Sequence, residues 1–168
     1  MKFLSNIRLL LIGLWLGAAV FFSFAIAPSA FAVLPSREVA GIMVSRSLMI
    51  LNISGIVIAI LAVAGSFVGV GITNKFLLWM ERFLLLVTAI ACAIGQFVIG
   101  LWLTFVKAQM GKPIDEVALD DPLRVSFNNL HEYSVWVLVG GMIAALIAFF
   151  ILAGRSVVPA NVKTSSKE

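Results

Sequence analysis

The stretch YSVWVLVGGMIAALIAFFILAG, residues 133–154, runs for 22 residues without a charged side chain. An α-helix rises about 1.5 Å per residue, so about 20 apolar residues cross the hydrocarbon core of a bilayer. A run of this length and composition therefore predicts a transmembrane helix.

Three other windows of the chain also lack charge. They comprise 28 residues between Arg8 and Arg37, 28 between Arg46 and Lys75, and 24 between Arg82 and Lys107. Each window is long enough for one membrane span. We expect spans at about 9–31, 47–71, 80–106 and 134–153, in an all-α, polytopic membrane four-helix bundle that forms a single membrane domain.

The composition supports a membrane environment. Hydrophobic residues make up 62% of the 168 residues and charged residues 12%, whereas soluble domains carry about 25% charged residues. The formal net charge is +4. The basic residues flank the spans and form no aromatic-interleaved stripe, so we expect contact with the lipid bilayer and no nucleic-acid partner.

The first window admits a second interpretation, because Ala30-Phe31-Ala32 resembles a signal-peptidase site. A signal peptide has an apolar core of about 7–15 residues. The run from Leu9 to Ala27 is 19 residues long, which favours a retained helix. Pro28 lacks a backbone donor, so we expect the helix to kink or stop there.

Basic residues in short loops set the orientation of membrane helices. Seven Lys and Arg residues lie on the side that holds both termini, and five lie on the other side. We therefore expect a multi-pass protein of the inner (plasma) membrane with both termini in the cytoplasm. The tail 156–168 is expected to be disordered.

Two segments are expected outside the membrane, at 33–46 and 107–133. In the second, Asp121-Pro122 is typical of an N-cap followed by proline at the first helical position. A helix that begins there carries Arg124, Asn128 and His131 within an arc of about 60°. We expect a short amphipathic external helix that continues into the fourth span.

The two external segments resemble each other weakly. Pro35 precedes Arg37 as Pro122 precedes Arg124, and each segment leads into a span of the same direction. Two similar hairpins in parallel orientation would give this pattern.

Polar and small residues inside the spans predict helix contacts. Asn52 and Gln96 lie well inside their spans, and we expect them to face the bundle and form interhelical hydrogen bonds. The Gly13-x-x-x-Gly17 and Gly65-x-x-x-Gly69 patterns permit close helix approach, either within one bundle or in a homo-oligomer.

Few residues offer chemistry. His131 is the only histidine and Cys92 the only cysteine, so the sequence predicts no metal site, no cofactor and no catalytic constellation. Glu81-Arg82 is expected to form an interfacial charge pair.

A candidate polar cluster remains on the outer face, composed of Arg46, Arg124, Asn128, His131 and Glu132. It could move protons or hold an anion or a lipid headgroup. In the alternative interpretation, Arg124 and His131 make structural hydrogen bonds that fasten the external helix to the bundle.

Two motifs carry a family resemblance. The first is Leu14-Trp15-Leu16-Gly17 with Phe21-Phe22, Ala27-Pro28 and Phe31; the second is Arg124-x-x-Phe127-x-x-Leu130-His131-x-x-Ser134. The chain resembles a small bacterial membrane family of unknown function that is similar to human transmembrane protein 205. It also shares features with copper-resistance D-like membrane proteins. The resemblance implies four spans and no established reaction.

The sequence thus favours a non-enzymatic accessory, small-solute or lipid-handling membrane protein with a polar site on the outer face, alone or within a larger membrane complex. The alternative is a membrane redox or metal-handling protein of the copper-resistance D-like or haem-linked kind. Such proteins use more histidines or metal ligands than this chain contains.

Overall fold

Four long helical rods form the molecule, which we describe from a computed structural model covering residues 2–67 and 74–157. The rods Phe3–Val33, Arg37–Gly65, Lys75–Met110 and Pro122–Gly154 are each long and apolar enough to cross a membrane. The chain is therefore an all-α, multi-pass membrane protein, as the sequence predicts.

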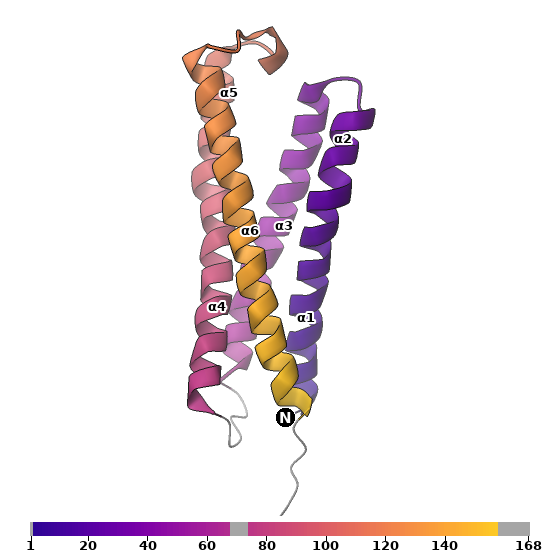
Figure 1. Cartoon of the computed structure of the whole chain (residues 1–168), viewed down its shortest axis with the longest axis vertical. Helices are drawn as coiled ribbons and strands as arrows, with labels where there is room; N and C mark the ends of the chain where they lie inside the picture. The colour runs from indigo at the N-terminus through magenta and orange to yellow at the C-terminus, as the bar shows by residue number, and fades with distance from the viewer. Residues whose placement is uncertain (1, 68–73, 158–168) are drawn as a thin grey trace, which may run out of the picture.

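Two of the rods are interrupted by π-helical turns (Figure 1). The first rod consists of α1 (Lys2–Phe21), the π-helix η1 (Phe22–Ile26) and α2 (Ala27–Val33). The second rod is α3 (Arg37–Gly65). The third consists of α4 (Lys75–Ala93), the π-helix η2 (Ile94–Ile99) and α5 (Gly100–Met110); a short 3-10 helix, η3 (Ile114–Glu116), then precedes α6 (Pro122–Val157).

The start of α6 is the one that the sequence predicts. The helix begins at Pro122, and an Oδ1 atom of Asp121 accepts a hydrogen bond of 2.8 Å from the backbone N–H of Leu123. From there α6 runs without interruption through the segment expected outside the membrane and the fourth span. The amphipathic helix that the sequence predicts is thus the first part of α6.

The expected spans 9–31, 80–106 and 134–153 lie within the observed rods. The α-helix of the second span, expected at 47–71, ends at Gly65, and residues 68–71 lie outside the described ranges. Helix α3 already begins at Arg37, so most of the expected external segment 33–46 is helical. Of the expected disordered tail, 156–157 belong to α6 and 158–168 lie outside the described ranges.

Pro28 does not stop the first rod. It lies near the start of α2, directly after the five-residue π-helix η1. A proline leaves one carbonyl of the preceding turn without its N–H donor, and a wider turn is one way for a helix to accommodate this loss. The helix therefore continues past Pro28 to Val33.

The rods pair into two hairpins. The first hairpin consists of α1 to α3 and the second of α4 to α6, and α3 packs against α4 while α1 packs against α6. Figure 1 shows helix α6 crossing from beside α5 at one end to the neighbourhood of α1 at the other. We call the end where α1 begins and α6 ends the terminal end. The opposite end, with residues 34–36 and 111–121, is the loop end.

Buried positions recur between the two hairpins. Arg8 of α1 and Glu81 of α4 are 73 residues apart, and the same spacing links the other buried residues of these two helices. Those pairs are Ile12 with Leu85, Trp15 with Thr88, and Ala19 with Cys92. Another constant spacing relates Gly55, Ala59 and Ala62 of α3 to Gly141, Ala145 and Ala148 of α6. The weak sequence echo between the hairpins therefore extends to their buried faces.

Each π-helix also falls at a corresponding place in its hairpin. Helix α1 has 20 residues before η1, and α4 has 19 residues before η2. Both hairpins therefore change helical geometry at nearly the same distance from the terminal end.

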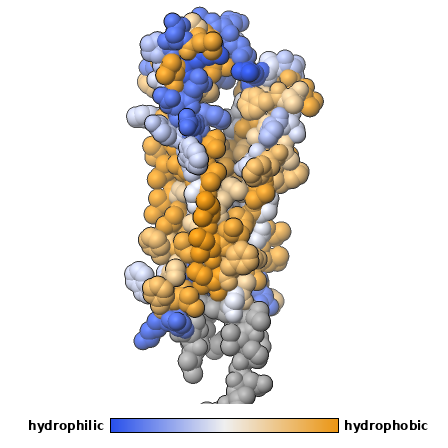
Figure 2. All heavy atoms as spheres, in the orientation of Figure 1, coloured by the Kyte–Doolittle hydropathy of each residue, from blue (hydrophilic) through white to orange (hydrophobic). Residues whose placement is uncertain are grey.

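Apolar side chains cover the outside of the rods along most of their length, and hydrophilic residues gather at the loop end (Figure 2). Trp79, Trp102 and Trp136 are all exposed, as expected of residues that face lipid near the membrane interfaces.

Small residues hold the centre of the bundle together. A Cβ at Gly55 would lie 2.7 Å from Nε1 of Trp15 and 2.8 Å from Sγ of Cys92. The same indole Nε1 donates a 2.9 Å hydrogen bond to the carbonyl of Leu51. Gly55 thus allows Trp15 to bond across the interface between α1 and α3.

Substituting Gly55 tests this packing. We expect Gly55→Ala to lower the free energy of unfolding by about 1–3 kcal/mol, because the added methyl group overpacks the contact with Trp15. The measurement is thermal unfolding in detergent, followed by circular dichroism. Gly17→Ala is the matched control, since its Cβ would meet nothing within 4 Å. Equal stability of the two variants would contradict the proposed packing.

Candidate functional site

The polar cluster expected on the outer face does not form a bonded group within the described part of the chain. Arg46 lies on α3, and Asn128, His131 and Glu132 lie on α6; all four side chains are exposed. Within residues 2–67 and 74–157, no hydrogen bond or ion pair joins these residues to one another. Their role as a site stays a prediction.

Arg124 has a structural contact. The Nη1 atom of its guanidinium donates a hydrogen bond to the backbone carbonyl of Val117, a buried residue of the loop before α6. This bond fastens the loop to the first turn of α6, whereas the alternative interpretation expects a bond that fastens the helix to the bundle. His131 makes no comparable bond within the part of the chain that the structure describes.

Two ion pairs connect the hairpins at the loop end. Arg37 at the start of α3 lies 3.8 Å from Asp115 of η3, and Lys107 of α5 lies 3.5 Å from Glu38 of α3. All four side chains are largely exposed, and such pairs contribute about 0–1 kcal/mol. The loop end is therefore only loosely closed.

A small cavity lies in the middle of the bundle, between the two hairpins. Its volume, counted as the space open to the centre of a water molecule, is about 10 Å³, which is close to the space of one water. The polar or small residues of its lining are Asn52, Ala91, Cys92, Gly95, Ser134 and Gly141.

Asn52 is the most unusual member of this lining. The residue is 3% exposed, yet its amide makes no hydrogen bond within the described part of the chain. A Cβ at Gly95 would lie 3.4 Å from its Nδ2 atom, so the amide is directed at η2. The expected interhelical bond of Asn52 is not formed, and the described residues likewise give Gln96 no partner. The amide of Asn52 thus retains its full capacity for hydrogen bonding to a molecule in the cavity.

The terminal end contains a buried ion pair. The guanidinium Nη2 atom of Arg8 on α1 contacts the carboxylate Oε1 atom of Glu81 on α4. Arg8 is 7% exposed, and Glu81 is fully buried. Gly65 of α3 gives the arginine its space, because a Cβ there would lie 2.9 Å from Cδ of Arg8. The expected Glu81–Arg82 charge pair is therefore wrong: Glu81 pairs across the hairpin boundary with Arg8.

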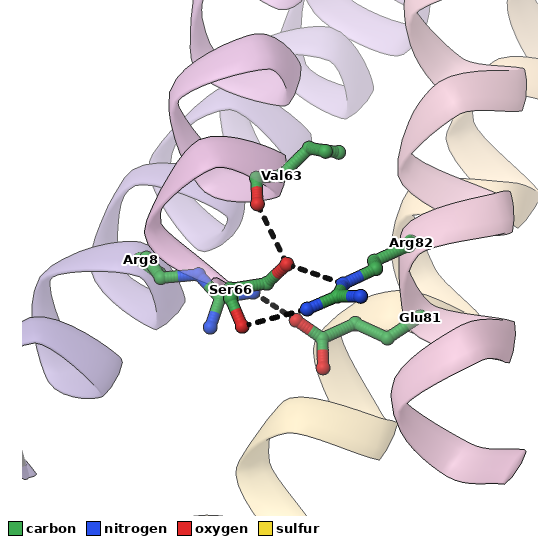
Figure 3. Close-up of polar contacts among 5 residues, drawn as sticks. All are labelled: Arg8, Val63, Ser66, Glu81 and Arg82. Atoms are coloured by element: carbon green, nitrogen blue, oxygen red, sulfur yellow. Dashed lines mark hydrogen bonds and ion pairs between the residues drawn. The ribbon is translucent and has the colours of Figure 1, made fainter. Parts of the chain in front are cut away.

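Arg82 has its own partners beside this pair (Figure 3). Its Nε atom donates a 2.7 Å hydrogen bond to the hydroxyl of Ser66, and its Nη2 atom donates a 3.0 Å hydrogen bond to the Ser66 carbonyl. The Arg82 Cζ atom also lies 3.8 Å from the centroid of the Phe67 ring. Consecutive residues of α4 thus point to the ends of two different helices, Glu81 to α1 and Arg82 to α3.

The hydroxyl of Ser66 links both hairpins. It donates a 2.6 Å hydrogen bond to the carbonyl of Val63 and accepts a hydrogen bond from Arg82 (Figure 3). We call Arg8, Ser66, Glu81 and Arg82 the terminal-end network. It joins α1 and α3 of the first hairpin to α4 of the second.

The sequence alone does not predict that Glu81 pairs with Arg8. The two residues lie near the edges of different expected spans, and nothing local connects residues 73 positions apart. The available signal was the recurrence between the hairpins, since both residues are the seventh of their helices.

Within residues 2–67 and 74–157, no group of three or more His, Cys, Asp or Glu side chains is placed to hold a metal ion. Among the described residues, the polar groups inside the membrane-spanning part are instead the amides of Asn52 and Gln96, one thiol, a few hydroxyls and the terminal-end network. This set suits hydrogen bonding and charge pairing.

A model for a domain of unknown function, DUF4149, matches residues 10–112. The chain belongs to the DUF4149 family. The DUF4149 match includes Asn52, Glu81 and Gly95, and it ends before α6. No curated protein and no solved structure matches the chain. The expectation of a membrane family of unknown function is confirmed, and the comparisons give no evidence for kinship with human transmembrane protein 205 or the copper-resistance D-like proteins.

Breaking the buried pair tests the terminal-end network. We expect Glu81→Leu to lower the free energy of unfolding by about 3–5 kcal/mol, because it leaves Arg8 buried without its counter-ion. The Arg8→Leu/Glu81→Leu double variant should regain most of the loss, since no buried charge then remains. Thermal unfolding in detergent measures both.

The exposed pair at the loop end supplies the control. Asp115→Ala should change the free energy of unfolding by less than about 1 kcal/mol. If Glu81→Leu were as mild as Asp115→Ala, the buried pair would not hold the hairpins together.

Proposed function

We propose that this membrane protein is a non-enzymatic handler of a small polar solute, which it binds between its two hairpins. The observation that carries the proposal is the amide of Asn52. It lines a cavity in the middle of a membrane bundle and has no hydrogen-bond partner within the described residues. An unpaired polar group at this depth is unfavourable unless a ligand or water satisfies it.

The dimensions of the cavity favour a small solute over a lipid. Its volume of about 10 Å³ accommodates one water, and a solute of a few heavy atoms would need only a slight separation of the walls. A phosphate-bearing headgroup would also need a cationic partner, and no Arg or Lys lines the cavity. The lining offers the Asn52 amide and the Ser134 hydroxyl, which suit an uncharged solute with donors and acceptors.

The loop end supports access from one side. Figure 2 shows the surface hollowed there, between the hydrophilic loop before α6 and the first hairpin. Within the described part of the chain, the contacts that link the hairpins at this end include the two exposed ion pairs and the packing of η3 against α3. A solute would pass between the diverging hairpins to reach Asn52.

The proposal includes the orientation expected from the basic residues. With both termini in the cytoplasm of the inner membrane, the loop end faces outward, and Arg46, Asn128, His131 and Glu132 lie on the outward part of α3 and α6. Kinship with human transmembrane protein 205 and the redox or metal-handling alternative stay predictions from the sequence, and no feature of the described chain favours the latter.

Substitution of Asn52 tests the proposal. Protein purified from its own membrane should carry a small polar molecule, to be identified by mass spectrometry of the released ligands. We expect Asn52→Leu to lower its amount at least tenfold, because the hydrogen-bonding amide is lost. Gly95→Ala should also lower it, because the added methyl group occupies the space beside Nδ2.

Gly17→Ala is the control for helix substitution, since it touches nothing within 4 Å and should retain the ligand. The proposal fails if wild type releases no small polar molecule, or if wild type and Asn52→Leu release the same amount.

A further inference from the structure

Contacts between the hairpins differ in kind at the two ends of the bundle. At the terminal end they are buried and polar, through Arg8–Glu81 and Arg82–Ser66. At the loop end they include two exposed ion pairs, Arg37–Asp115 and Lys107–Glu38, beside the contact of η3 with α3. Every one of these contacts joins the first hairpin to the second.

The cavity lies between these two sets of contacts. Its residues Asn52 and Cys92 are 3% exposed, so a solute larger than water cannot reach or leave it unless the hairpins separate. Separation at the loop end would break the two exposed ion pairs. Separation at the terminal end would break the terminal-end network.

Two of the rods change from α-helix to π-helix, and such a movement would pivot at these positions. The π-helices η1 and η2 lie at corresponding positions of the two hairpins, and Gly95 of η2 lines the cavity. A π-helical turn has weaker backbone restraint than an α-helix and often lies at functional sites. The terminal-side parts of the hairpins, α1 and α4, are continuous α-helices.

We infer that the two hairpins rock against each other, exposing the cavity to the two sides of the membrane in turn, so that the protein moves its solute across the bilayer. The terminal-end network is the gate on one side, and the two loop-end ion pairs are the gate on the other. This inference rests on the proposed function for its cargo. The movement itself rests on the contacts between the hairpins.

Polar contacts suit a gate because they are specific in geometry and exchangeable with water. Opening at the terminal end would hydrate Arg8, Glu81 and Arg82 together, which replaces their mutual contacts by contacts with solvent. Apolar side chains that held the same place would instead lose their burial without replacement.

Cys92 provides a native reporter, because it is the only cysteine and lines the cavity. The test labels full-length protein in right-side-out and inside-out membrane vesicles with a membrane-impermeant trimethylammonium methanethiosulfonate. The labelled fraction is read by intact mass. A C-terminal tag, digested by added protease, reports which end of the bundle faces the reagent.

We expect Arg8→Gln/Glu81→Gln to raise the labelling rate from the terminal end at least tenfold and to lower it from the loop end. Arg37→Gln/Lys107→Gln should have the opposite effect on both rates. The charge-exchanged variant Arg8→Glu/Glu81→Arg should return terminal-end labelling to within threefold of wild type, and Cys92→Ser gives the background.

Rates that rise together from both sides would show general loosening and overturn the inference, as would rates that no variant changes. The labelling does not require Asn52. If accessibility alternates while Asn52→Leu keeps its ligand, the rocking movement stands and the proposed binding group is wrong. If Asn52→Leu loses its ligand while accessibility does not alternate, the protein binds its solute without moving it across.

Discussion

Charge burial at one end of the bundle constrains how α1, α3 and α4 are arranged. A lone arginine or glutamate inside a membrane helix costs about 2.5–3.5 kcal/mol even on the mildest scales, so each must find a counter-ion. Arg8 finds Glu81 on a helix of the other hairpin, and Gly65 provides the space for its side chain. Once this pair forms, α1 and α4 have a fixed height relative to each other. Ser66 and Arg82 then fix the end of α3 against the same helix.

The polar and apolar parts of the bundle depend on this alignment. With Arg8 level with Glu81, the matching residues of the two hairpins reach matching depths, and the small residues of α3 and α6 are buried inside the bundle. Gly55 accommodates Trp15, and a Cβ at Gly141 would lie 3.1 Å from the Cβ of Ala91. Above these close contacts the first and third rods change to the π-helices η1 and η2. The contacts between the hairpins at the loop end include the two exposed ion pairs and the packing of η3 against α3. The cavity at Asn52 lies between the tight end and the loose end.

Local signals in the sequence predict where the helices lie, but they do not predict which side chains pair between the helices. Charge-free windows located the four spans, and Asp121-Pro122 located the start of α6, because both depend on solvent and backbone geometry within a few residues. Three features depend instead on residues brought together by packing. They are the pairing of Arg8 with Glu81, the amide of Asn52, which has no partner among the described residues, and the π-helices η1 and η2. The candidate polar cluster, from Arg46 to Glu132, is defined by the chemistry of its side chains. Because Arg46 lies on α3 and the others lie on α6, their spacing in the sequence does not show whether these side chains contact one another.

The central claim is that the buried terminal-end network holds the hairpins together more tightly than the exposed ion pairs of the loop end do. Electron–electron double resonance tests it most directly, with spin labels on exposed residues of a Cys92→Ser protein in liposomes. One pair, at Phe3 and Phe76, reports the terminal end, and a second pair, at Val33 and Leu119, reports the loop end. We expect a narrow distance distribution dominated by the closed state for the first pair, and at least two well-populated distances for the second. Equally narrow distributions at both ends would contradict the claim.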